Sequence, residues 1–168
     1  MNKSIIIING SGGVGKDTFC EMVDKVSNGR CYTYSSVSQV KRIARRHCGW
    51  NGNKTEKDRK FLSDLKDLLT EYNDLPFKDV CNHIDTFLKD GFIEVMFIHI
   101  REPKEIQKVV DKYPQVKTIL ISSMRVDPIT SNHADAEVFN YEYDYNIYND
   151  GSLDCLKEMA ETFYHQLQ

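Results

Sequence analysis

The stretch Ser4–Thr18, SIIIINGSGGVGKDT, decides the fold of this chain. It begins with four consecutive isoleucines, and an uninterrupted β-branched run of this length predicts a strand buried on both faces, as in a parallel sheet. A glycine-rich loop follows at once. Phe19, Met22, Val23 and Val26 then recur at helical spacing. The opening therefore predicts a strand, a glycine loop and an amphipathic helix.

The glycine loop matches the Walker A pattern, in which Gly10, Gly15 and Lys16 stand at fixed spacing. In this pattern backbone N–H groups surround phosphates, and the following helix adds the positive end of its dipole. Glycines let the backbone approach without a side-chain clash. We expect the loop to bind a nucleoside triphosphate, and a plain glycine-rich turn is the structural alternative. The predicted cofactor-binding residues are Gly10, Gly12, Gly13, Val14, Gly15, Lys16, Asp17 and Thr18.

Asp17 occupies the position at which this pattern usually places a Ser or Thr on Mg²⁺. A carboxylate can serve there directly or through a water, because Mg²⁺ prefers oxygen ligands and keeps several waters. Thr18 can then hydrogen-bond the α-phosphate. The predicted metal residue is Asp17, and the predicted cofactors are ATP and Mg²⁺.

Strand and helix patterns alternate along the rest of the chain. Strand patterns occupy Cys31–Ser35, Phe92–Ile100, Val116–Ser122 and Tyr143–Tyr148. Helical patterns occupy Val37–His47 and begin after Thr55, near Pro76, near Pro103 and after Ser152. Thr55 and Asp58 form a capping-box pattern, and an apolar stripe from Phe61 to Tyr72 follows. After Pro76, inward positions are predicted for Val80, Ile84, Phe87 and Leu88. This alternation predicts a three-layer α/β/α fold with a five-stranded, mostly parallel sheet.

Length and composition narrow the class of protein. The 168 residues favour a single domain, 1–168, and the net charge of -3 argues against a general binder of nucleic-acid polymers or membrane surfaces. No apolar run approaches the ~20 residues of a membrane span, and the N-terminal run is too short for a signal peptide. The five widely spaced cysteines contain no CxxC, which favours a reducing compartment. We expect a cytoplasmic monomer or homodimer.

The ending Gly15-Lys16-Asp17-Thr18 resembles that of deoxynucleoside monophosphate kinases in the P-loop kinase superfamily, and animal-type phosphomevalonate kinases have a similar Gly-Lys-Asp ending. Further stretches similar to those kinases are Ser35–Arg46, Asp58–Leu62, His99–Glu105 and Tyr143–Leu153. The resemblance implies a P-loop kinase fold, acceptor-binding helices at about 36–90 and a lid at about 124–138 that contains Arg125, Asn132 and Asp135. His99 stands where the family usually has Asp.

Two arginines are the predicted catalytic partners of Lys16. Arg101 follows the end of a central strand, where ligands of open α/β sheets bind, and we expect it to grip the acceptor phosphate. Its structural alternative is a surface arginine paired with Glu102 or Glu105. Arg125 leads the polar lid segment and would reach the transferring phosphoryl group on closure. A solvated loop charge is the alternative there.

Substrate binding is also predicted for Lys41, Arg42 and Arg59. Lys41 and Arg42 belong to a basic helix face with Arg45 and Arg46, and a solvated face is the ordinary interpretation of such a run. His99 either serves the metal shell or is a satisfied buried histidine. Trp50 either stacks on a base or closes the edge of the core.

Together these residues predict ATP-dependent phosphoryl transfer to a nucleoside or deoxynucleoside monophosphate. Such chemistry needs aligned reactants and neutralised charge rather than a covalent nucleophile. Two alternatives stay open. One is a kinase of a non-nucleotide small phosphate, such as phosphomevalonate or dephospho-coenzyme A. The other is a nucleotide-binding regulator with little catalysis.

Overall fold

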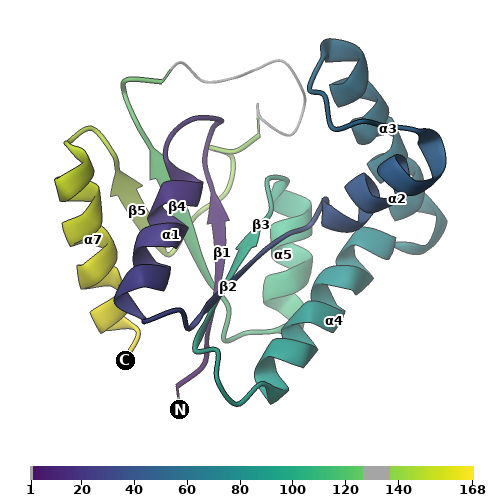
Figure 1. The fold of residues 1–168 in the computed structure, drawn as a ribbon. Helices are drawn as coiled ribbons and strands as arrows, with labels where there is room; N and C mark the ends of the chain where they lie inside the picture. Colours follow the sequence, from purple (N-terminus) through teal and green to yellow (C-terminus); the bar gives the residue numbers. More distant parts are fainter. Residues whose placement is uncertain (1, 127–136) are drawn as a thin grey trace.

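The computed structural model describes residues 2–126 and 137–168. Five strands, β1 (Ser4–Asn9), β2 (Cys31–Ser35), β3 (Val95–His99), β4 (Lys117–Ser122) and β5 (Tyr145–Tyr148), form one sheet in the order β2-β3-β1-β4-β5. Every pairing in the sheet is parallel. The predicted α/β class is confirmed, and the sheet is wholly rather than mostly parallel (Figure 1).

The helices cover both faces of the sheet. They are α1 (Lys16–Val26), α2 (Ser38–Cys48), α3 (Glu56–Asn73), α4 (Leu75–Lys89), α5 (Pro103–Lys112) and α7 (Leu153–Gln166). Helices α1 and α7 pack with one face in one hydrophobic core, and α4 and α5 pack with the other face in a second core (Figure 1). Among the described residues, no helix is both long and apolar enough to span a bilayer.

Strand β1 explains why an unbroken isoleucine run was needed. Ile6 and Ile8 lie in the core beneath α1 and α7, whereas Ile5 and Ile7 lie in the core beneath α4 and α5. Each of these side chains is at most 1% exposed. Because β1 is central in the sheet and both faces are covered, alternate positions are equally buried. The same burial fixes the end of β1, and hence the start of the glycine loop.

Several helix starts follow the predicted chemistry. The Thr55 side chain accepts from the Asp58 N–H, and the Asp58 carboxylate accepts from the Thr55 N–H at 3.0 Å, which completes the capping box. The Ser152 hydroxyl accepts from Cys155 N at the start of α7. Pro103 is the first residue of α5. These local hydrogen bonds satisfy N–H groups that a helix cannot pair internally.

Two strands, β3 and β5, are shorter than the sequence predicted. Phe92 and Ile93 precede β3 because their N–H groups donate to the Asp90 carboxylate, at 2.7 and 2.6 Å, in a turn. Strand β5 begins at Tyr145 because Asp144 instead accepts from the N–H and hydroxyl of Thr118. Side-chain acceptors of this kind compete with the sheet for backbone donors.

The apolar stripe of α3 is only partly covered: Phe61, Leu62, Leu65 and Leu69 are half-buried, and two members are exposed. Leu68 is 63% and Tyr72 81% exposed, because α3 packs mainly on α2 and α4. The inward position predicted for Leu88 is also wrong: this side chain is 39% exposed. Val80, Ile84 and Phe87 already fill the buried face of α4, and Leu88 lies one residue, or about 100°, around the helix.

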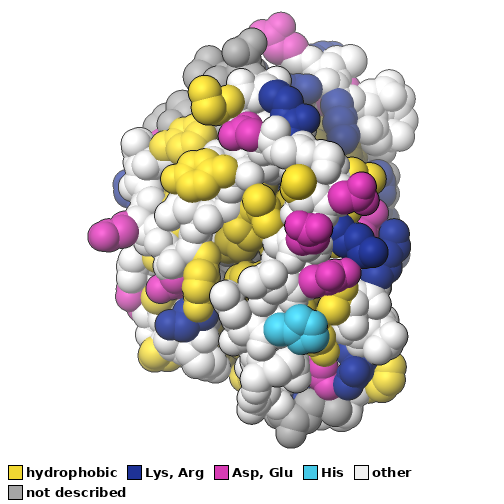
Figure 2. Space-filling view, turned by 90° about the vertical axis from the view of Figure 1, so that its left-hand side faces the viewer, with side chains coloured by type: hydrophobic (Ala, Val, Ile, Leu, Met, Phe, Trp, Pro, Cys, Tyr) yellow, Lys and Arg dark blue, Asp and Glu magenta, His cyan; other side chains and the backbone are white. Residues whose placement is uncertain are grey.

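The edge at β5 carries a second group of exposed apolar side chains. Figure 2 shows hydrophobic side chains gathered on the side of the molecule that carries α7 and β5. The large exposed hydrophobic residues of these elements are Tyr145, Tyr148, Leu153 and Met159. The basic residues of α2 lie beyond the opposite edge strand, β2. The two ends of the sheet therefore differ in surface chemistry.

Candidate active site

The glycine loop between β1 and α1 is shaped by positions that only glycine fits. Gly10 has a φ of 145°, and a Cβ there would lie 2.2 Å from the carbonyl oxygen of Ile121. Gly15 has a φ of 96°, and a Cβ there would lie 2.6 Å from Asn149 Nδ2. Both distances are far below van der Waals contact. The loop therefore keeps its backbone open in the way that close approach to phosphate requires.

Polar contacts hold this loop from two sides. Lys16 Nζ donates to the carbonyl oxygens of Gly10 at 2.6 Å and Ser11 at 2.7 Å, so the ammonium lies across the loop. Asn149 Nδ2, from the turn after β5, donates to Val14 O at 2.9 Å. Among the residues described by the structure, Ser11 Oγ is the single buried side-chain polar atom without a hydrogen-bond partner. The open cradle, the lysine and this orphaned hydroxyl all fit a bound phosphate chain.

Asp17 and His99 face each other beside the loop. Asp17, in the first turn of α1, has a side chain 90% exposed, and its Oδ1 lies 3.7 Å from His99 Nε2. Burial at the end of β3 lowers the pKa of His99, with Asp17 opposing and Lys16 and Arg101 reinforcing the shift. The imidazole is therefore neutral at pH 7. The described part of the chain contains no group of three or more His, Cys, Asp or Glu that could hold a metal ion. Asp17 fits Mg²⁺, which in phosphate sites takes one or two carboxylates together with phosphate oxygens and water.

Asn9, at the end of β1, ties the loop to the neighbouring segments. Its Oδ1 accepts from Gly10 N at 2.8 Å, and its Nδ2 donates to Arg101 O at 3.0 Å and to the Tyr143 hydroxyl at 2.7 Å. The Tyr143 hydroxyl donates onward to Val138 O at 2.7 Å. Burial raises the pKa of Tyr143 to about 12. Sequence reasoning missed Asn9, although a polar residue that closes a fully buried strand was a usable signal.

Arg101 follows β3 and is half-buried beside this network. The two carboxylates proposed as its surface partners are engaged elsewhere: Glu102 pairs with Lys66, and Glu105 pairs with Lys108 at 3.0 Å. Lys66 is the buried residue of α3. Its ion pair therefore fixes α3 against the segment that carries Arg101. Sequence reasoning missed Lys66, since nothing in an apolar helix stripe marks one lysine as buried.

Lys41 is the residue of α2 that the structure brings to Arg101. Burial lowers the pKa of Lys41, and the charges of Lys54, Arg101 and Arg45 lower it further, while Asp17 raises it. The charges of Lys16, Arg101, Lys41 and Asp17 all act on His99 as well. Three predicted cationic site residues thus gather around Asp17 at the carboxyl end of the sheet.

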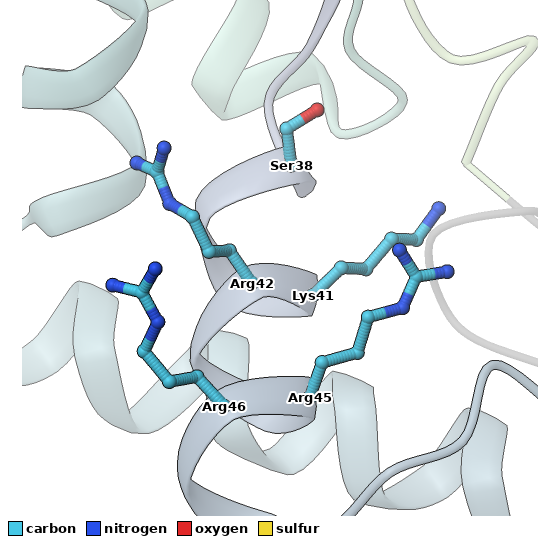
Figure 3. Close-up of a pocket in the computed structure, with 5 residues that line it drawn as sticks. All are labelled: Ser38, Lys41, Arg42, Arg45 and Arg46. Atoms are coloured by element: carbon cyan, nitrogen blue, oxygen red, sulfur yellow. The ribbon is translucent and has the colours of Figure 1, made fainter.

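Arg42 and Arg59 have local partners instead. The Arg42 guanidinium donates to Gln39 Oε1, and Arg59 Nε donates to Lys54 O at 3.2 Å. In Figure 3, Lys41 and Arg45 extend to one side of α2, and Arg42 and Arg46 extend to the other. The structure therefore separates Lys41 from Arg42, which the sequence had grouped together.

Arg125 lies beside the glycine loop rather than beside Arg101. Its guanidinium donates to the carbonyl oxygens of Asn149, at 3.2 Å, and Gly151. Since Asn149 also contacts Val14, Arg125 is one residue removed from the loop. The predicted lid residues Asn132 and Asp135 lie outside the described residues.

Trp50 is only 8% exposed, and its Nε1 donates to Asn53 O at 2.9 Å. The Arg45 guanidinium lies 5.0 Å from the centroid of its ring. A ring held in this way closes the edge of the core. These contacts favour the structural interpretation of Trp50 over stacking on a base.

Comparisons with known proteins relate this architecture to solved kinases. A comparison with models of protein families found no match, and a comparison with curated proteins found none. An unliganded sugar kinase from a Janibacter species superposes with a TM-score of 0.54 at 14% identity, covering 98% of this chain and 95% of that one. Two others have TM-scores of 0.48. The APS kinase of Mycobacterium tuberculosis with AMPPNP and APS is 14% identical and covers 99% and 97% of the two chains. The shikimate kinase of Aquifex aeolicus is 9% identical and covers 96% of each.

At these identities the likeness concerns the fold. The sugar kinase matches over nearly the full length of both chains. This chain's parallel sheet has the order β2-β3-β1-β4-β5, with the glycine loop after its central strand. The chain has the fold of the P-loop kinases.

Proposed function

We propose that this protein is a kinase that transfers the γ-phosphoryl group of ATP, with Mg²⁺, to a small phosphorylated acceptor, first of all a nucleoside or deoxynucleoside monophosphate. One observation carries the proposal. The glycine loop with Lys16 lies at the same edge of the sheet as Arg101 and Lys41, around the exposed carboxylate of Asp17. A phosphate donor and a phosphate acceptor both need such a gathering of cations.

The residues divide the work between donor and acceptor. The loop amides and Lys16 hold the β- and γ-phosphates, and the phosphate oxygens replace the Gly10 and Ser11 carbonyls as partners of Lys16. Asp17 would hold Mg²⁺, which screens charge on the donor phosphates. Arg101 and Lys41 hold the acceptor phosphate. An ionised phosphate is itself the nucleophile, so no general base is required. We assign Arg125 a role in turnover, because its guanidinium contacts Asn149 and Gly151 and Asn149 in turn contacts the glycine loop.

A non-nucleotide phosphate acceptor is the second candidate. Trp50 would have been the obvious aromatic platform for an acceptor base, and its ring is buried. The alternative of a nucleotide-binding regulator predicts the same donor site without turnover. The identity of the acceptor therefore decides between the two kinases, and the presence of turnover decides between a kinase and the regulator.

An acceptor panel tests the proposal. The full chain is incubated with ATP, Mg²⁺ and one acceptor at a time: each nucleoside and deoxynucleoside monophosphate, phosphomevalonate, or dephospho-coenzyme A. We expect ADP production that depends on one class of acceptor and on Mg²⁺. In Asp17→Ala the Mg²⁺ concentration for half-maximal rate should rise, and Asp17→Ser should recover part of the loss. ATP binding without acceptor-dependent ADP production would favour the regulator and reject the kinase.

A further inference from the structure

A basic groove on α2 extends beyond the residues assigned to the acceptor phosphate. It has a volume of about 540 Å³ and is lined by Ser38, Lys41, Arg42, Arg45 and Arg46. No carboxylate is among these described lining residues, and the helix SQVKRIARRHC contains no Asp or Glu. The groove therefore presents four cations and one hydroxyl to whatever enters it.

The four cations form two pairs with different directions. Lys41 and Arg45 stand four residues apart, as do Arg42 and Arg46, so each pair shares one side of the helix. Figure 3 shows Lys41 and Arg45 extending to one side of α2, and Arg42 and Arg46 extending to the other. The Lys41 side is the one within electrostatic range of Arg101 and Asp17. Arg42 and Arg46 line the same groove.

No carboxylate in residues 2–126 and 137–168 forms an ion pair with any of these four cations. Arg45 lies over the Trp50 ring, and Arg42 contacts the neutral Gln39 side chain. Like charges four residues apart destabilise a helix. A fully solvated basic face is the ordinary alternative, but Lys41 is half-buried and its neighbours Lys54, Arg101 and Arg45 disfavour its charge.

We propose that the acceptor carries two anionic groups: Lys41 and Arg101 hold the phosphate that receives the phosphoryl group, and Arg42 and Arg46 hold the second anion. This inference rests on the proposed function, since it refines the acceptor of that same site. The substrate class is a small bis-anion, either a bisphosphate or a phosphate ester with a carboxylate. Arginine suits the second group, because its planar fork binds phosphate or carboxylate through two parallel hydrogen bonds.

Calorimetric titration of the full chain without a donor tests the second subsite. Two matched pairs of probes are used: adenosine 5′-monophosphate against adenosine 3′,5′-bisphosphate, and fructose 6-phosphate against fructose 1,6-bisphosphate. At least one bisphosphate should bind about tenfold more tightly than its monophosphate. Arg42→Ala/Arg46→Ala should abolish that ratio. The control Lys25→Ala/Lys117→Ala removes two exposed charges near the amino ends of the strands and should retain the affinity ratio.

Each other outcome overturns the proposal. Equal affinity within both probe pairs, or no binding of either bisphosphate to the folded wild type, removes the second subsite. A ratio that survives in Arg42→Ala/Arg46→Ala assigns it to other residues. Tighter binding of a single-stranded oligonucleotide, lost in the same variant, would make the groove a polymer site. Titration with AMPPNP and the acceptor panel report the kinase separately. Acceptor-dependent ADP production with equal probe affinities rejects only the second subsite, whereas bisphosphate binding without turnover rejects only the kinase.

Discussion

The proposed donor side and the proposed acceptor side of the site differ in the chemical groups that would bind phosphate. The proposed donor side is the loop at Gly10–Thr18, where backbone N–H groups would hold the phosphates and where Gly10 and Gly15 leave no room for a Cβ. The acceptor side is made of long cationic side chains from α2 and from the segment after β3, held by packing and by the Lys66–Glu102 ion pair. A backbone site is specified by a short contiguous sequence, whereas a side-chain site depends on where separate helices come to rest.

Substitutions on the two sides should also differ in how strongly they reduce activity. A loop residue such as Lys16 should stabilise the transition state of the donor phosphates more than their ground state, and its geometry is fixed by β1 and α1. An acceptor cation acts through one flexible side chain with neighbouring cations that can share its role. We therefore expect sharp effects on the donor side and graded effects on the acceptor side.

The largest effect should come from Lys16→Ala. Removing the charge that stabilises the developing γ-phosphoryl group should lower kcat by at least about a hundredfold. The fold should survive, because the Lys16 ammonium donates to the loop carbonyls of Gly10 and Ser11 and a loop lysine supports no core. Steady-state kinetics and thermal melting measure both properties, with Lys25→Ala, at the far end of α1, as the control. Wild-type turnover in folded Lys16→Ala would remove the functional difference between the two sides.

Arg101→Ala should produce the next largest effect, seen mainly in the KM of the acceptor. Loss of a charge-assisted hydrogen bond in a half-buried site costs about 1.5–3 kcal/mol, or roughly a tenfold to hundredfold weaker acceptor. The KM of ATP should change little. Lys104→Ala removes a nearby exposed charge from α5 and serves as the control. A rise in the KM of ATP alone would move Arg101 to the donor side.

Gly15→Ala should weaken both the loop and the fold. Its φ of 96° is strained for alanine, and the new Cβ would also meet Asn149 Nδ2 at 2.6 Å. We expect a loss of about 1–3 kcal/mol in the free energy of unfolding, with weaker AMPPNP binding. Gly29→Ala is the matched control, because Gly29 has a φ of 76° with no atom within 4 Å of the added Cβ. Urea unfolding that gives equal losses for both variants would show that the Asn149 contact does not shape the loop.

The smallest expected effect concerns pH and His99. Burial holds the pKa of His99 below its ordinary value of 6.5, so the unfolded chain takes up the proton first as the pH falls. The stabilisation from the neutral imidazole is complete above pH 6.5 and is lost as the pH falls through the lower folded-state pKa. His99→Gln should therefore flatten the decline of the unfolding free energy below pH 6.5. His165→Gln, at an exposed position of α7, should leave the decline unchanged. Parallel curves for wild type and His99→Gln would contradict the role of burial.

The parts of the structure that the sequence predicted best are those set by interactions between residues close together in the chain. The isoleucine run gave β1 with its observed bounds, and Thr55 with Asp58 gave the capping box of α3. The helical spacing of apolar residues alone predicted their burial less well. The stripe on α3 has helical spacing, yet Leu68 and Tyr72 are exposed because α3 packs mainly on α2 and α4.

What the sequence determined by itself is the strand, the glycine loop and the helix of the donor side, since steric limits on φ and on Cβ contacts act within a few residues. Only the tertiary structure decided the acceptor side. It brought Lys41 to Arg101, gave Arg42 a local partner, and engaged Glu102 with Lys66 from another helix. Charges act through space and their partners lie far apart in the chain, so the packing of α2 and α3 decides which cations meet.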